Sequence, residues 1–189
     1  SSAASDVYKR QDMYEEDGGS NHVHVFDSLS ACCGEAVIAM KIAECAEQGM
    51  SFDEVVRTVS EFRDGMRTYF VLETLETLRK NGRLTNLQAL LANVLSIKPV
   101  MSAKDGEIIK LEQTRGINKA LKRMCEVILE NVKEPQNKIL AISHCNCPER
   151  AEYVKGLLLD KCSFKDVVIV DTAGVATMYA NDGGIVVAV

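Results

Sequence analysis

Residues 139–171, ILAISHCNCPERAEYVKGLLLDKCSFKDVVIVD, decide the fold. Residues 139–143 and 167–171 are short runs of β-branched and apolar side chains, which favour strands. Residues 148–159 between them open with a proline and predict a helix. A third β-prone run follows at 185–189. Strands that alternate with helices predict an α/β fold, in which helices cover a sheet.

A hairpin and further helices are expected before this stretch. Residues 97–101 and 107–111 predict two strands joined around Asp105–Gly106, because both turn positions favour a positive φ. The apolar spacing over 117–128 predicts a long helix that ends before Pro135. The other elements expected in this part are a strand at 69–72, a short helix ended by Gly82 and a helix at 87–95.

The first third of the chain predicts one strand, at residues 23–26, and two apolar helices. Gly34 opens the first helix, and Ser51 with Glu54 forms a capping box at the start of the second. One strand is too little to close a core, so we expect the helix stripes to stay exposed. These stripes include Ile38, Ile42, Val55, Val59 and Phe62.

The domain organisation follows from this imbalance. We expect residues 1–22 to be a tag-like or disordered leader, because they show no periodicity and lack a starting Met. Residues 23–67 are expected to be a remnant of one domain, and residues 68–189 to form a more complete one.

Composition excludes several classes of protein. The net charge of −5 and the pI near 5.3 argue against a general nucleic-acid binder. No run of about 18 uncharged apolar residues occurs, so no membrane span is predicted. The seven cysteines are odd in number and lack a disulfide-scaffold layout, which predicts a reducing, cytoplasmic location.

Four residues at three places in the chain are candidates for binding an anion. His144 ends a strand just before a helix, where backbone N–H groups attract anions. Arg83 follows a helix end, and its guanidinium fork suits a carboxylate or a phosphate. Ser28 and Ser30 precede the first helix, where their hydroxyls either hold an anion or cap the helix, and capping is the favoured interpretation.

Arg115 begins a helix with Lys119, Lys122 and Arg123, a positive cluster that is more typical of a solvated face. The chain has no Gly-rich phosphate loop, no Ser/His/Asp spacing and no H-E-x-x-H motif, so no catalytic machinery is predicted.

Two rival functions remain open. A small α/β hydrolase or phosphotransferase would use His144 with Asp171 or Asp182. A metal or thiol module would combine His144, Cys145 and Cys147 with Cys32 or Cys33, although this spacing matches no standard zinc pattern.

Several stretches resemble the DegV family in the order the family has them. The most specific is LETLETLRKNGRL at 72–84, followed by LSIKP at 95–99 and DG at 105–106. Other matching positions are Val25–Phe26–Asp27–Ser28 with Gly34, Arg115 with Lys119–Ala120, Ile142–Ser143–His144 before Pro148–Glu149, and Ala151–Glu152.

The resemblance implies two α/β domains, here a partial N-terminal one followed by a C-terminal one with a mixed sheet. They would enclose a long-chain fatty acid, with its carboxylate at the domain junction and its tail in an apolar tunnel. It implies a non-catalytic, lipid-binding subunit without a cofactor, which presents the carboxylate to a separate ATP-dependent fatty acid kinase subunit. Carried over by position, His144 would help to bind the head group, in the cleft between the two parts. Arg83 and Arg115 would lie near it or near the kinase contact.

The chain also departs from the family pattern. Family members normally have a Thr-Ser loop and a Ser-Gly-Thr loop, and the hydroxyls of both contribute to the carboxylate site. This chain starts after both, so half of that site is expected to be missing. Many members end in His-x-Gly-Pro-Gly, where this chain has YANDG at 179–183, and Cys32 stands where a serine is frequent.

Overall fold

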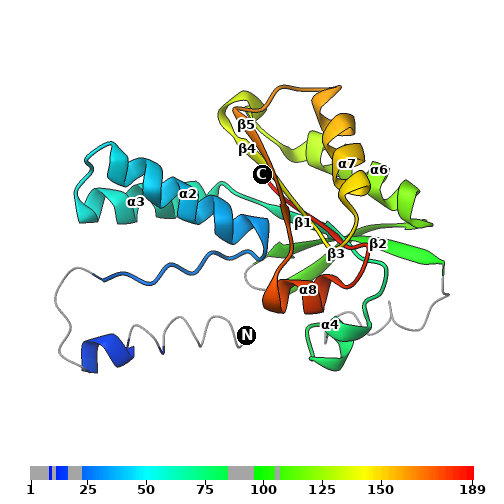
Figure 1. The fold of residues 1–189 in the computed structure, drawn as a ribbon, viewed down its shortest axis with the longest axis horizontal. Coiled ribbons are helices and arrows are strands. Elements are labelled where there is room, and N and C mark those ends of the chain that lie inside the picture. Colours follow the sequence, from blue (N-terminus) through cyan, green and yellow to red (C-terminus); the bar gives the residue numbers. More distant parts are fainter. Residues whose placement is uncertain (1–8, 10–11, 17–22, 85–95, 105–106) are drawn as a thin grey trace.

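The computed structural model describes residues 9, 12–16, 23–84, 96–104 and 107–189 (Figure 1). The strands of this described part form one six-stranded mixed sheet in the order β3-β2-β1-β6-β4-β5. This confirms the predicted mixed α/β class. The strands are β1 Thr68–Val71, β2 Ile97–Lys104, β3 Glu107–Arg115, β4 Ile139–His144, β5 Asp166–Asp171 and β6 Ile185–Ala188.

Four of the six strands run in the same direction. β4 and β5 are parallel, whereas β1–β2, β2–β3, β1–β6 and β6–β4 are antiparallel pairs. The last residues of β1, β3, β4 and β5 therefore lie along one edge of the sheet, which we call the carboxyl edge. Ligands of open α/β sheets bind beyond such an edge.

Helices α6 (Ile117–Asn131) and α7 (Pro148–Leu159) cover one face of the sheet (Figure 1). Strand side chains alternate between faces, so Leu140 and Ile142 of β4 point toward these helices. They join the main core, which contains Leu121, Met124, Ile128, Val154 and Leu158.

Helices α2 (Cys33–Glu47) and α3 (Phe52–Asp64) lie at the opposite face. Cys33 and Val37 of α2 pack on Ala141, Val186 and Ala188. The predicted capping box is present at α3, where the Ser51 N–H donates to the Glu54 carboxylate at 2.8 Å.

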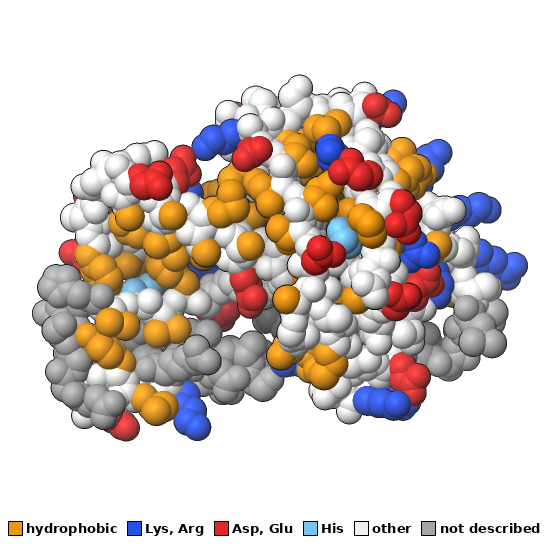
Figure 2. All heavy atoms as spheres, viewed as in Figure 1, with side chains coloured by type: hydrophobic (Ala, Val, Ile, Leu, Met, Phe, Trp, Pro, Cys, Tyr) orange, Lys and Arg blue, Asp and Glu red, His pale blue; other side chains and the backbone are white. Residues whose placement is uncertain are grey.

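The expectation that the stripes of α2 and α3 stay exposed was wrong for their central residues. Ile38, Cys45 and Val59 are buried because the two helices pack against each other. Hydrophobic side chains are still visible along this pair in Figure 2, and Met40 and Phe52 are 40% and 37% exposed.

Two short helices lie next to each other at the carboxyl edge. α4 (Glu76–Lys80) follows β1, and α8 (Gly174–Ala180) follows β5. The Thr77 hydroxyl of α4 donates to Asn181 Oδ1 at 3.2 Å, just after α8. Beneath them lies a buried cluster of Leu72, Leu78, Leu84, Met101, Cys145 and Ala180.

Three elements differ from the sequence-based expectations. Residues 23–26 are not a strand, since no described strand lies beside them to complete a ladder. Helix α8 and a short 3₁₀ helix at Pro135–Asn137 were not predicted. The helix expected at 87–95 and the turn at 105–106 fall outside the described residues.

The two parts expected from the sequence contribute differently to this fold. Residues 68–188 supply all the described strands, and residues 33–64 supply α2 and α3. Polar contacts join them: Lys138 Nζ donates to the Gly65 carbonyl at 2.7 Å, and Lys165 Nζ lies 3.2 Å from Glu44 Oε1. The domain boundary near residue 67 stays a prediction.

Candidate functional site

His144 is the last residue of β4 and lies at the carboxyl edge. Its side chain is only 7% exposed, and Nδ1 lies 3.3 Å from Oδ1 of Asp171, its partner in the parallel pairing of β4 and β5. The two atoms are not aligned for a hydrogen bond, so Nδ1 is buried without a hydrogen-bond partner in the described part of the chain. Such an atom in a native protein calls for an explanation, and a ligand is one.

The pairing of β4 with β6 shows which face of the sheet His144 lies on. His144 is paired across the sheet with Ile185, which belongs to the core under α6 and α7. Directly paired residues share a face, so His144 lies on the face opposite α2. Its place in a cleft between the two parts of the chain stays a prediction.

Arg83 lies close to the same edge. It follows α4, and its N–H donates to the Leu78 carbonyl at 2.9 Å, across the turn that Gly82 makes with a φ of 68°. The next residue, Leu84, is buried in the same cluster as Cys145, the neighbour of His144. The structure thus brings the segments that carry Arg83 and His144 together.

Arg115 lies at the carboxyl edge but far from His144. It ends β3, and β2, β1 and β6 separate β3 from β4. Four steps of about 4.8 Å between neighbouring strands put the two backbones on the order of 19 Å apart. Arg115 and His144 therefore do not contact the same carboxylate.

Ser28 and Ser30 lie away from this edge. The Ser30 hydroxyl is hydrogen-bonded to that of Thr68, at the start of β1 and roughly 10 Å along the strand from the carboxyl edge. Ser28 Oγ accepts from the Ser30 N–H at 3.2 Å. Neither side chain caps α2, whose N-cap is Cys32 with a φ of 56°. The favoured interpretation of these serines as helix caps was therefore wrong.

Ser143, which points from β4 toward α2, was not predicted as a site residue. Its hydroxyl is buried without a hydrogen-bond partner of good geometry among the described residues. It adjoins the thiols of Cys32 and Cys33. Burial raises the pKa of Cys32 to about 11, although the Ser143 hydroxyl acts in the opposite direction.

The cysteines do not form a metal or thiol centre in the described part of the chain. Burial raises the pKa of Cys125 to about 12 and raises those of Cys33 and Cys147. Thiols with raised pKa values are protonated at neutral pH and are poor ligands and nucleophiles. Among the described residues, no group of three or more His, Cys, Asp and Glu side chains is placed to hold a metal ion.

We expect Cys32 to react slowly with iodoacetamide at pH 7.5. A pKa of about 11 leaves roughly two orders of magnitude less thiolate than in a free cysteine. Mass spectrometry of tryptic peptides after timed alkylation measures the rate, with urea-unfolded protein as the control. Alkylation of Cys32 at the same rate in folded and unfolded protein would contradict this expectation.

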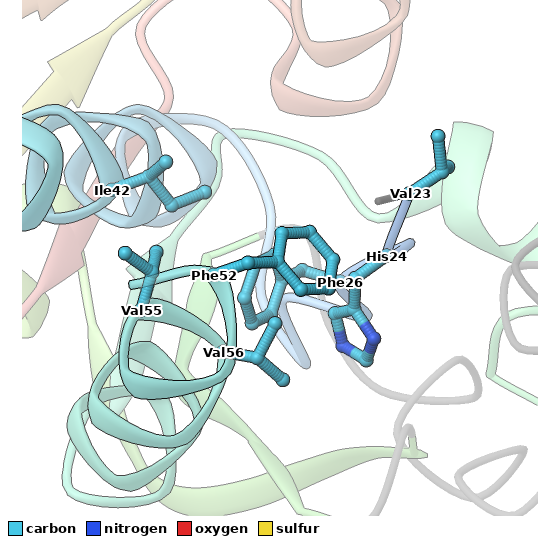
Figure 3. Close-up of a pocket in the computed structure, with 7 residues that line it drawn as sticks. All are labelled: Val23, His24, Phe26, Ile42, Phe52, Val55 and Val56. Carbon is cyan, nitrogen blue, oxygen red and sulfur yellow. The ribbon is translucent and has the colours of Figure 1, made fainter. Parts of the chain in front are cut away.

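An apolar hollow of about 360 Å³ lies between residues 23–26 and the pair α2–α3 (Figure 3). Phe26, Ile42, Phe52, Val55 and Val56 line it with Val23 and His24. The ring of His24 packs edge-on against Phe26, with 4.6 Å between the ring centres. None of the described residues that line this hollow is a Lys or Arg, so its described lining suits apolar material rather than a carboxylate.

Comparisons with known proteins agree with this fold. A family model described as "Uncharacterised protein, DegV family" matches residues 1–189. A DegV domain-containing protein of Clostridium perfringens is 27% identical over 175 residues, which cover 89% of this chain and 60% of that protein. The chain thus spans less than two thirds of the length of this relative.

Two solved structures are similar over most of the chain. A DegV family protein from Ruminococcus gnavus, described with vaccenic acid, has a TM-score of 0.89 and 48% identity, covering 94% of this chain and 64% of that one. The Streptococcus pneumoniae fatty acid kinase (Fak) B3 protein, loaded with linoleic acid, has a TM-score of 0.83 and 26% identity, covering 94% and 63%.

The described helices include none that is long and apolar enough to cross a membrane. The family match extends over the whole chain, and the arrangement of strands and helices is shared with solved members. The chain belongs to the DegV family.

Proposed function

We propose that the full-length protein carrying this chain encloses one long-chain fatty acid between two α/β units. Residues 23–67 belong to the first unit and residues 68–189 to the second. The observation that carries the proposal is the 48% identity and TM-score of 0.89 to the R. gnavus protein, which is described with vaccenic acid. Its fold matches 94% of this chain.

The head-group site we propose is the carboxyl edge, with His144 and Arg83 as the principal donors. The buried Nδ1 of His144 lacks a hydrogen-bond partner in the described part of the chain, and Arg83 lies on the neighbouring segment. A carboxylate that accepts hydrogen bonds from cationic groups is held more strongly than one bound by neutral donors. The head group bound by His144 is too far away to be shared by Arg115, Ser28 or Ser30. We assign these three residues to contacts farther along the ligand or with a partner.

The tail would supply most of the affinity. Burying a CH₂ group contributes about 0.8 kcal/mol, so a tail of about 16 carbons binds strongly without a covalent bond. Part of the tail could lie against the apolar side chains of α2 and α3 that line the hollow in Figure 3. The fatty acid is then the ligand, and the function needs no cofactor.

We further propose that the protein is a non-catalytic subunit that presents the carboxylate to a separate ATP-dependent kinase. The similarity to the S. pneumoniae fatty acid kinase B3 protein supports this assignment. In this scheme the partner supplies the nucleotide site.

A small hydrolase is the second candidate, and one observation favours it. His144 Nδ1 and Asp171 Oδ1 lie 3.3 Å apart, and a hydrolase would need the two to align into a hydrogen bond when substrate binds, since they are not aligned here. Hydrolysis of p-nitrophenyl esters by the full-length protein, lost on replacing His144, would support this function over the carrier.

We expect His144→Ala to weaken fatty acid binding about tenfold, because it removes a hydrogen bond to a charged group. Titration of the full-length protein with vaccenic acid by calorimetry measures the affinity. Asn131→Ala is the control, since Asn131 ends α6 at the opposite edge of the sheet and its amide donates to the Val127 carbonyl, away from both the carboxyl edge and the hollow. Equal affinities of wild type and His144→Ala would assign His144 a structural role only.

A further inference from the structure

Three charged side chains meet where β1 ends. Glu73 follows β1, and its carboxylate lies 2.9 Å from Lys98 Nζ at the start of β2. On its other side it lies 2.7 Å from Arg150 Nη2 in the first turn of α7. Lys98 also donates to the Glu73 carbonyl at 2.6 Å. None of the three was predicted as a site residue, because they are far apart along the sequence, although Glu73 and Lys98 lie within the stretches that resemble the DegV family.

Arg150 uses the other arm of its guanidinium for a different segment. Nη1 donates to the Gly183 carbonyl at 2.7 Å. The Gly183 N–H donates to the Cys145 carbonyl at 2.8 Å, and the Cys145 N–H donates to the Gly184 carbonyl at 3.0 Å. Arg150 therefore links the end of β1 to the turn before β6, and this turn is bonded to the residue that follows His144.

The packing around this link is close. Gly183 has a φ of 80°, and a Cβ there would lie 2.5 Å from Arg150 Nη1 and 3.0 Å from Glu73 Cγ. The side chains of Lys98, Arg150 and Glu73 are 16%, 25% and 33% exposed, so water screens them less than it screens a surface pair. Burial alone would raise the pKa of Glu73, but the hydrogen bonds from Lys98 and Arg150 bring it below its usual value.

We propose that Arg150 is a positioning residue that sets the affinity for the ligand carboxylate. It fixes the position of the segment after His144 relative to the segment that leads to Arg83, although it does not itself contact the head group. This inference rests on the proposed function. Binding groups must be held within about 0.5 Å of their productive geometry, so loosening the link weakens the contact to the head group.

The chemistry of the link requires arginine. The planar guanidinium reaches a carboxylate and a carbonyl at once, whereas the single ammonium of lysine is a point charge on a flexible stem. Arg150→Lys therefore keeps the charge and loses the link. A merely structural ion pair would behave differently, because its loss would lower stability without distinguishing charged from uncharged ligands.

The test compares the affinity for vaccenic acid with that for its methyl ester, in the full-length protein. We expect Arg150→Lys to weaken binding of the acid about tenfold and to leave that of the ester within about twofold. Arg123→Lys is the matched control. Arg123 on α6 also pairs with three carboxylates, Glu112 on β3 and Glu126 and Glu130 on its own helix, at 3.0, 3.0 and 2.9 Å, away from Arg150. It should change neither affinity.

Each result of these affinity measurements either supports or overturns the positioning role of Arg150. Unchanged affinity of Arg150→Lys for the acid, equal losses for acid and ester, or the same loss in Arg123→Lys would overturn the positioning role. If Arg150→Lys does not fold, Glu73→Gln is measured in the same way, because it keeps a hydrogen-bond acceptor and removes the charge. Wild-type protein that binds neither acid nor ester refutes the proposed function itself, so the two failures are distinguishable.

Discussion

Replacing Ile142 by alanine is expected to lower the free energy of unfolding by about 2–5 kcal/mol. Ile142 is fully buried at the centre of β4 and packs in the core beneath α6 and α7. Truncation removes apolar contacts and leaves a cavity that regular elements on both sides cannot close. Urea unfolding followed by circular dichroism measures the change.

Ile139→Ala is the matched control, because it makes the same change in the same strand at a partly buried position on the other face. We expect its effect to be less than half that of Ile142→Ala. Equal effects of the two substitutions would contradict the assignment of the main core to the face under α6 and α7.

Replacing Gly184 by alanine is expected to cost about 1–3 kcal/mol of stability and to weaken fatty acid binding. A Cβ at this position would lie 2.4 Å from the Ala180 carbonyl oxygen and 3.1 Å from Leu72 Cδ2. The first obstacle is backbone, so no rotamer change relieves it and the end of α8 must move. Because Gly184 is hydrogen-bonded to Cys145, the disturbance reaches His144.

Gly156→Ala is a control that is expected to change stability in the opposite direction. Gly156 lies inside α7, and a Cβ there would meet nothing within 4 Å. Alanine should therefore stabilise the protein by about 0.5–1 kcal/mol. Thermal unfolding of both variants, with vaccenic acid titrations, checks the pair. Gly184→Ala with wild-type stability and affinity would show that α8 does not pack on the turn as described.

Local patterns predicted most of the sheet and its covering helices. The hairpin strands flank a turn signal, α6 has a strong apolar period, and α7 opens with Pro148, so these elements could be predicted without knowledge of distant contacts. Helix α8 was missed because GVATMYA has only seven residues with no apolar period, and its contacts to α4 come from far along the chain. Residues 23–26 have strand-like composition, but a strand also needs a neighbour.

The candidate site was predictable only in part. His144 was found because it ends an apolar run before a helix, and the DegV resemblance singled out Arg83 and Arg115. Their spacing depends on the strand order, which put Arg115 far from His144. Arg150 carried no signal because its two partners, Glu73 and Gly183, are distant in sequence. The serines before α2 fit a capping pattern, but Cys32 takes the N-cap position instead.

The most direct test of fatty acid binding is native mass spectrometry of the full-length protein, before and after incubation with equimolar vaccenic acid. The carrier function predicts a species heavier than the polypeptide by one long-chain fatty acid, released on denaturation and identified by lipid extraction. It also predicts that vaccenic acid fills any empty protein at a ratio of one to one. Detection of the bare polypeptide mass alone, both before and after incubation, would contradict the function proposed for this chain.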